Sequence, residues 1–393
     1  MTISPTIVQT LQTAVDRQRL IDTAVQLIAA PSPTGRAEKA CEALAQILIA
    51  DGFSVERPTG GHERAPAVVA RLHSSNPGRT GRVLQFNGHL DTVHLPFVPP
   101  QVEGNRITGS GASDMKGGIA AAVEALRILR DTKTLAAGSV LLTAHDLHEA
   151  PWGAGQQLDQ LIRDGYLGDG VLLPEPLCDC LPVVGRGGAT WKVTIRRPGP
   201  PVHEVMRPMD EPSVIAAGAE LVSRLGRLED QLAAKSDPIA GTETVFVGQI
   251  HSGEIFNQYP QECGLEGTRR WLPGTGRQEV EKEFRALLND LERDTQTTVQ
   301  ADFRFIRDDF RLDLQDPLVE AFQQALEAVS GQRLAVGPKP FMDDGNSFWG
   351  LARKPAITHG PCAGGQHTVN EWASIDDLVR LALVYALTAV AYC

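Results

Sequence analysis

Continuous apolar runs alternate with helical patterns in the first part of the chain. The runs GRVLQF (81–86), SVLLTA (139–144) and GVLLP (170–174) are separated by helical periodicity over 115–130 and 154–165. Strands that are apolar on both faces belong to sheets covered by helices on both sides, and the intervening helices allow parallel strands. The pattern therefore predicts an α/β domain built on a mostly parallel, mixed sheet. It resumes after residue 310, with a further strand at 354–360 and a closing helix from Ser374.

The middle of the chain follows a different pattern. The segments ATWKVTIRRPG (189–199) and TETVFVGQIHSG (242–253) alternate apolar with polar residues, as half-exposed antiparallel strands do. Two amphipathic helical stretches, 212–235 and 277–294, lie among such strands. We therefore predict an inserted α+β lid over residues 187–309, suited to dimerisation. Residues 1–186 and 310–393 then form one discontinuous catalytic domain.

The composition is that of a soluble globular protein. Of the 393 residues, 42% are hydrophobic and 22% are charged, and the formal net charge is −11. Such an acidic chain is unsuited to nucleic acid or an anionic membrane as a partner. The start of the chain lacks the basic region and compact apolar core of a signal peptide, and the six cysteines form no CxxC pair. We therefore expect a cytoplasmic protein with reduced thiols.

Side chains that can bind metal recur where the predicted strands end. The set consists of His89, Asp91, Asp114, His148, Glu149, Glu175 and His367. In open α/β sheets ligands bind outside the carboxyl ends of the strands, so these side chains are expected to meet there. Histidines mixed with carboxylates suit zinc, cobalt or manganese better than magnesium or calcium. Two such ions bridged by one carboxylate would polarise a carbonyl and lower the pKa of a shared water. Asp114, just before a helix, is the natural bridge.

The ordered motifs GHLDTV, GSGASDMKGG, HE, PEP and GGQHTVNEW resemble those of the di-zinc metallopeptidases. That family includes acetylornithine deacetylase, succinyl-diaminopimelate desuccinylase, aminoacylase and glutamate carboxypeptidase. The resemblance covers essentially the whole chain. It implies that His89 and Glu175 hold one zinc, that Asp114 bridges two ions, and that His367 binds the second. It also implies that Asp91 orients the ring of His89.

The resemblance gives the inserted domain a part in substrate binding. His203 matches a lid histidine that helps to hold the substrate oxygen, in some relatives across a dimer. Asn257 and Arg270 match residues that grip the carboxylate of the substrate, and an arginine fork suits a carboxylate bidentately. The resemblance therefore implies a homodimer formed through the lid.

One departure from the family pattern follows the third strand. Relatives usually carry two adjacent glutamates, the first acting as base and the second as metal ligand. Counting back from Gly155, Glu149 takes the base position and Ala150 replaces the ligand. A shift of one residue instead makes Glu149 the ligand and puts His148 at the base position. We prefer Glu149 as the base, with His148 contributing to the metal site in place of the lost carboxylate.

Together these assignments predict a metal-dependent hydrolase with two divalent ions, zinc before cobalt or manganese. Its substrate would be a small amide or peptide with a free carboxylate next to the cleaved bond. Deacylases of N-acyl amino acids, dipeptidases and carboxypeptidases share this chemistry. The alternative is a catalytically dead or single-metal relative that acts as a binding protein, since the altered glutamate pair could abolish hydrolysis and leave the cleft.

Overall fold

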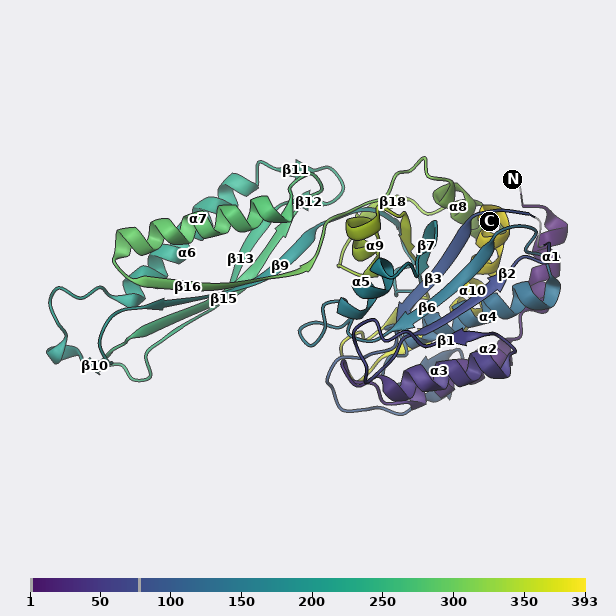
Figure 1. Ribbon diagram of the computed structural model, residues 1–393, viewed down its shortest axis with the longest axis horizontal. Helices are drawn as coiled ribbons and strands as arrows, with labels where there is room; N and C mark the ends of the chain where they lie inside the picture. Colours follow the sequence, from purple (N-terminus) through teal and green to yellow (C-terminus); the bar gives the residue numbers. More distant parts are fainter. Residues whose placement is uncertain (1–2, 77–78) are drawn as a thin grey trace. The chain divides into compact units, whose positions relative to one another are not determined.

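The computed structural model describes residues 3–76 and 79–393 and divides into two compact units (Figure 1). Unit 1 comprises Met1–Val183, Leu312–Pro338 and Asp343–Cys393, and unit 2 comprises Val184–Arg311 and Lys339–Met342. The expected domain boundaries, 186/187 and 309/310, lie close to these divisions. Residues 339–342, which were expected in the catalytic domain, belong instead to unit 2, because Lys339 lies against Gly185 and Met342 against Gly188.

A six-stranded mixed sheet forms the centre of unit 1. Its order is β1-β2-β6-β3-β7-β19, in which β6, β3, β7 and β19 pair in parallel, and β2 is antiparallel to both of its neighbours, β1 and β6. The α/β class predicted from the apolar runs is confirmed. The strands are β1 (Val55–Glu56), β2 (Val68–His73), β3 (Val83–His89), β6 (Ser139–His145), β7 (Gly170–Leu173) and β19 (Ala356–Thr358).

Helices cover both faces of this sheet, as the apolar strands require. A Cβ on Gly88 would lie 2.9 Å from Ile119 of α4, so β3 and α4 approach each other too closely for any side chain there. Asn87, one residue earlier on the opposite face, bonds Asp344 of α9. The helices of unit 1 are α1 (Pro5–Ala14), α2 (Arg17–Ala29), α3 (Glu38–Ala50), α4 (Lys116–Thr132), α5 (Gln156–Arg163), α8 (Pro317–Ser330), α9 (Asp344–Ala352) and α10 (Ile375–Tyr392).

The remaining short strands form two small sheets outside the central one. One small sheet has the order β20-β21-β5-β4 and another has the order β17-β8-β18. The closing helix α10 begins after Ser374, whose hydroxyl accepts the amide N–H of Asp377 as an N-cap. The short strands are β4 (Gln101–Glu103), β5 (Arg106–Thr108), β8 (Leu181–Gly185), β17 (Phe310–Arg311), β18 (Val336–Lys339), β20 (Ala363–Gly364) and β21 (Trp372–Ser374).

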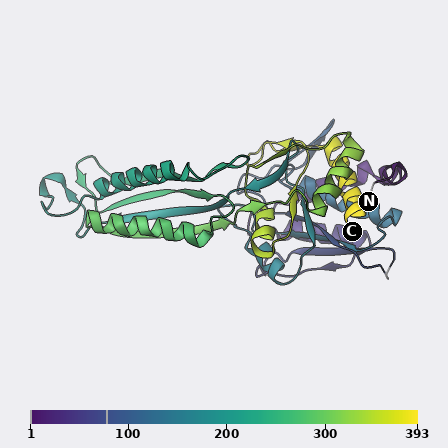
Figure 2. The ribbon, with the colours of Figure 1, turned by 90° about the horizontal axis from the view of Figure 1, so that it is seen from above.

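Unit 2 is an antiparallel sheet of order β13-β15-β9-β16 with two long helices packed on it. Figure 2 shows α6 and α7 side by side. Trp191, Trp271 and Phe284 lie in the core between sheet and helices, and β13 is an edge strand. The elements are β9 (Gly187–Arg196), β10 (Val202–His203), the 3₁₀ helix η1 (Glu204–Met206), α6 (Val214–Leu232), β11 (Ser236–Asp237), β12 (Gly241–Thr242), β13 (Thr244–Ser252), β14 (Gln258–Tyr259), β15 (Glu262–Trp271), α7 (Arg277–Thr295) and β16 (Thr298–Arg307).

No helix within 3–76 or 79–393 is both long enough and apolar enough to span a lipid bilayer.

Candidate metal centre

Polar side chains gather where the parallel strands of unit 1 end. His89 and His145 are the last residues of β3 and β6 and stand in register with each other. Glu175 follows the end of β7, and Asp114 lies just before α4. His89, His145 and Glu175 are buried, and Asp114 is mostly so. The carboxyl edge of the sheet therefore brings together residues that are far apart in the sequence.

His89 lies between two carboxylates. Its Nε2 is 3.1 Å from Oδ1 of Asp114 and 3.6 Å from Oε1 of Glu175. Its Nδ1 is 3.0 Å from the main-chain carbonyl of Asp91. Because a carbonyl oxygen only accepts, Nδ1 carries the proton of the neutral ring and the lone pair of Nε2 points at the carboxylates. This is the orientation of a metal-binding histidine.

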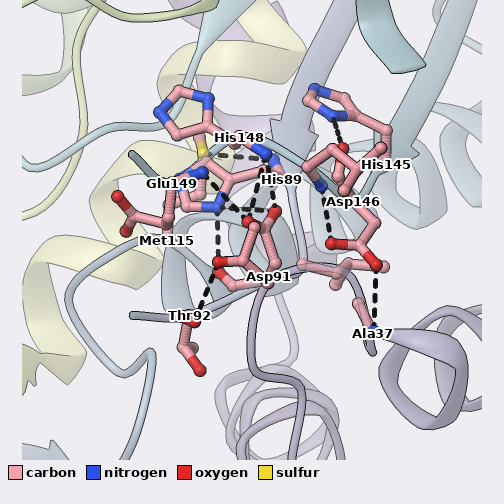
Figure 3. Close-up of polar contacts among 12 residues, drawn as sticks. Ala37, His89, Asp91, Thr92, Met115, His145, Asp146, His148 and Glu149 are labelled. Atoms are coloured by element: carbon pink, nitrogen blue, oxygen red, sulfur yellow. Dashed lines mark hydrogen bonds and ion pairs between the residues drawn. The ribbon is translucent and has the colours of Figure 1, made fainter. Parts of the chain in front are cut away.

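The carboxylate of Asp91 serves the loop after β6 more than the ring of His89. It stands 3.6 Å from Nδ1 of His89, and it accepts the amide N–H groups of His148 at 3.1 Å and Glu149 at 3.0 Å. Figure 3 shows the dashed contacts that join Asp91 to His89 and to the loop of His148 and Glu149. Asp91 thus orients His89 through its carbonyl oxygen and fixes residues 148 and 149 through its side chain.

A second group of ligating atoms forms on the other side of Asp114. Nε2 of His367 is 3.5 Å from Oδ2 of Asp114 and 3.2 Å from Oε2 of Glu149. Asp114 therefore offers one oxygen to His89 and the other to His367. The His367 side chain is 56% exposed, whereas that of His89 is fully buried. The second group is the one open to solvent.

Neighbouring charges and burial shift the pKa values of the residues in both groups. Burial lowers the pKa of His89, but its hydrogen bonds to the carboxylates of Asp114 and Glu175 raise it well above its ordinary value. Asp114 and Glu149 raise the pKa of His367 to about 10. Burial and the nearby charge of Asp114 raise the pKa of Glu175 to about 8. Carboxylates crowded together out of water need positive charge beside them.

His148 is held by Asp344, a residue that the sequence analysis missed. The ring of His148 stacks on His89 at 3.9 Å between centroids, with Nε2 3.9 Å from Oε1 of Glu175. Nδ1 of His148 and Nε2 of His145 each lie 2.8 Å from a different oxygen of Asp344. Asp344 is 1% exposed and also accepts a 2.7 Å hydrogen bond from Asn87. The only signal in the sequence was a pair of aspartates at the start of a helix.

Glu371 is a second missed residue, although the motif GGQHTVNEW contains it. Its carboxylate accepts the amide N–H groups of Ser113 at 3.3 Å and Asp114 at 3.2 Å. Burial and the charge of Asp114 raise the pKa of Glu371 to about 7. Glu371 thus fixes the backbone that presents Asp114 to both histidines.

Three expected substrate-binding residues belong to unit 2. Nδ2 of Asn257 is 3.0 Å from Nε2 of His203, so these two residues of the β10 and β14 segments are brought together. Arg270 is half-buried on β15 and forms no ion pair with the acidic residues that the structure describes. The neighbouring Arg269, by contrast, is buried against Glu243 at 2.7 Å. Arg269 is therefore held by Glu243 inside unit 2, whereas Arg270 has no such partner among the described residues.

The spacing of the donor atoms fits divalent metal. Two ligand atoms about 2.1 Å from one tetrahedral zinc ion are about 3.4 Å apart. The four contacts that join His89 to Asp114 and Glu175, and His367 to Asp114 and Glu149, lie between 3.1 and 3.6 Å. His148 offers Nε2 to the group of His89 and Glu175. These residues are suited to hold divalent metal.

A mixed sheet whose carboxyl edge carries histidines and carboxylates around one aspartate is typical of metal-dependent hydrolases. The family model for peptidase family M20/M25/M40 matches residues 85–391. The chain therefore belongs to this peptidase family, and the resemblance seen in its motifs is confirmed. The protein is a metallohydrolase that acts on amide or peptide bonds.

Individual relatives agree in sequence and in fold. A succinyl-diaminopimelate desuccinylase of Methylobacterium sp. (strain 4-46) is 29% identical over 93% of this chain and 94% of its own. The aminopeptidase PepT of Bacillus cereus superposes with a TM-score of 0.79 at 19% identity, over 96% of this chain and 100% of that one. The YXEP protein of Bacillus subtilis, described as a dinuclear metal-binding peptidase, has a TM-score of 0.69 at 15% identity, over 95% and 97%.

Proposed function

We propose that this hydrolase cleaves the amide bond of a small substrate with a free carboxylate beside that bond. The observation that carries the proposal is the position of Asp114 between the groups of His89 and His367. N-acyl amino acids and short peptides both carry such a carboxylate. A desuccinylase and an aminopeptidase are among the relatives described above, which supports a small amide or peptide substrate here.

The metal ligands would be His89, His148 and Glu175 at one ion and His367 at the other, with Asp114 shared between them. Zinc suits this donor set, and cobalt or manganese would also fit. Bound there, the ions would polarise the substrate carbonyl and lower the pKa of a water. The family has a glutamate ligand where this chain has Ala150. The imidazole of His148, which Asp344 orients toward Glu175, would take the place of that lost ligand.

Glu149 is proposed as the general base. Its backbone is fixed by Asp91, and its carboxylate, 4% exposed, lies within reach of His89 and Asp114. A carboxylate there can take the proton of the attacking water and return it to the leaving amine. The 3.2 Å contact with His367 would also suit a metal ligand. Glu149→Gln separates the roles: turnover lost with both ions retained supports the base, whereas loss of one ion makes Glu149 the ligand.

Unit 2 is proposed to bind the substrate. Arg270, which has no acidic partner among the described residues, would hold the free carboxylate. Asn257 lies beyond the other end of β15, about 27 Å of strand away, so it would reach the same carboxylate only from a second copy of the chain. His203, to which Asn257 is hydrogen-bonded, would donate to the oxygen on which charge develops during the attack.

We also propose a homodimer formed through unit 2. The edge strand β13 has open hydrogen-bonding groups, and its side chains Phe246 and Ile250 are more than half exposed. An open edge with apolar side chains is a surface on which a second copy can continue the sheet. The cytoplasm is the proposed location, which suits a chain whose six cysteines are free.

The first experiment is metal analysis of protein purified without chelator, followed by hydrolysis assays on N-acyl amino acids and dipeptides. About two ions per chain, with turnover that a chelator abolishes and added zinc, cobalt or manganese restores, is the expected result. One ion or none, with no turnover on any substrate, would instead favour a binding protein that has lost its catalytic metal.

A further inference from the structure

Two thiols outside the metal centre lie against each other. The sulfur atoms of Cys178 and Cys362 are 3.0 Å apart, although 183 residues separate them in the chain. Both belong to unit 1. Neither takes part in the proposed hydrolysis. Sulfur atoms so close need to approach by only about 1 Å to reach the length of a disulfide bond.

The backbones on either side of the two thiols are already joined. The amide of His359 donates to the carbonyl of Leu173 at 2.9 Å, and the amide of Gly360 donates to the carbonyl of Leu177 at 3.0 Å. A Cβ on Gly360 would lie 2.1 Å from the carbonyl oxygen of Glu175, so the two segments are in close contact. The loop after β7 and the loop after β19 therefore run together up to the cysteines.

The two thiols differ in access to solvent. Cys362 is exposed, whereas Cys178 is half-buried. Burial and the neighbouring thiol raise the pKa of Cys178 to about 12, so this thiol is protonated at neutral pH. An oxidant in solution therefore meets Cys362 first, and Cys178 stands behind it as the resolving thiol.

We propose that Cys178 and Cys362 form a reversible disulfide bond with each other. The oxidant is a low-molecular-weight disulfide such as oxidised glutathione. The Cys362 sulfur attacks the oxidant, forms a mixed disulfide and releases one glutathione thiol. The Cys178 sulfur then attacks the sulfur of Cys362 and releases the second. Two electrons pass from the protein to the oxidant, and the two thiol protons leave with the glutathione products. This reaction does not depend on the proposed hydrolase function.

The bond would fasten the loop that carries Glu175 to the loop that leads to His367. Because it would also constrain the unfolded chain between residues 178 and 362, it should stabilise unit 1. We expect the melting temperature to rise by about 5 °C or more on oxidation and to return on reduction. Cys180 offers a matched control, because its sulfur faces the carbonyl of Pro338 at 3.8 Å and not another thiol.

The test equilibrates the full chain and its variants C178S, C362S and C180S with reduced and oxidised glutathione. Free thiols are counted after unfolding, linked peptides are mapped, and melting is followed with and without reductant. The wild type should fall from six free thiols to four, with a 178–362 link and higher melting temperature. C180S should also lose two thiols and gain stability, whereas C178S and C362S should gain none. Retention of all six thiols, a persistent glutathione adduct on Cys362, a link to Cys180, or an unchanged melting temperature would each overturn the proposal.

Discussion

Asp344→Asn changes one atom of a buried side chain and tests how His148 is held. The carboxylate of Asp344 can only accept, so it compels Nδ1 of His148, 2.8 Å away, to carry the proton. The lone pair of the neutral ring is then on Nε2, the atom that faces Glu175. An amide nitrogen at the same place would donate to Nδ1 and move the proton to Nε2. That tautomer cannot bind metal through Nε2.

The size of the effect follows from these contacts. Loss of a buried partner that orients a ligating histidine lowers metal affinity about 10- to 100-fold, or roughly 1.4 to 2.7 kcal/mol. Loss of one hydrogen bond to a charged group lowers the free energy of unfolding of the metal-free protein by roughly 1.5–3 kcal/mol. Both effects should appear together, because one carboxylate oxygen is responsible for both.

Competition with a calibrated zinc chelator measures the affinity, and urea unfolding measures the stability. Asp343→Asn is the matched control. Asp343 is equally buried, but its carboxylate accepts hydrogen bonds from the amide of Gly345 and the hydroxyl of Thr358. Neither of these bonds involves His145 or His148. This control should alter stability without altering metal affinity. An Asp344→Asn protein with unchanged affinity would refute the reasoning, and a lower kcat at unchanged affinity would make His148 a base and not a ligand.

Three further results are expected. Burial, with Arg380 nearby, lowers the pKa of His359 to about 4, so between pH 6.5 and 4 the unfolded chain binds a proton that the folded chain does not. The free energy of unfolding that this residue contributes is therefore lost as the pH falls, by about 2.5 kcal/mol between pH 7.5 and 4.5. In urea unfolding, His359→Leu and His359→Gln should both remove that loss. A pH dependence of the free energy of unfolding equal to that of the wild type would contradict the assignment. Arg270→Ala should raise KM about 10- to 100-fold for substrates with a free carboxylate and leave their amide analogues unaffected, and equal KM values would exclude the assigned contact. If the proposed dimer forms through β13, Phe246→Lys should give a folded monomer in light scattering, and an intact dimer would place the interface elsewhere.

The sequence was sufficient to predict the main helices and strands and several residues of the candidate site. Continuous apolar runs can be buried only in a sheet covered on both faces, so they predicted the mixed sheet of unit 1. The ends of those runs pointed to His89 and Glu175, because parallel strands end at the same edge. The change to alternating apolar and polar residues near 187 marked the inserted unit, because strands with one face exposed alternate in this way. Each of these inferences depends on periodicity within a short stretch of chain.

Tertiary structure alone decided how distant side chains meet. Asp344 contacts His148 at a sequence separation of 196 residues, and Cys178 contacts Cys362 at a separation of 184. No local sequence pattern predicts either contact. The sequence suggested the carboxylate of Asp91 for the ring of His89, but the ring bonds the carbonyl while the carboxylate binds two amides. Local periodicity specifies which face of an element is buried, whereas the partner of a polar group depends on which other elements the packed core brings beside it.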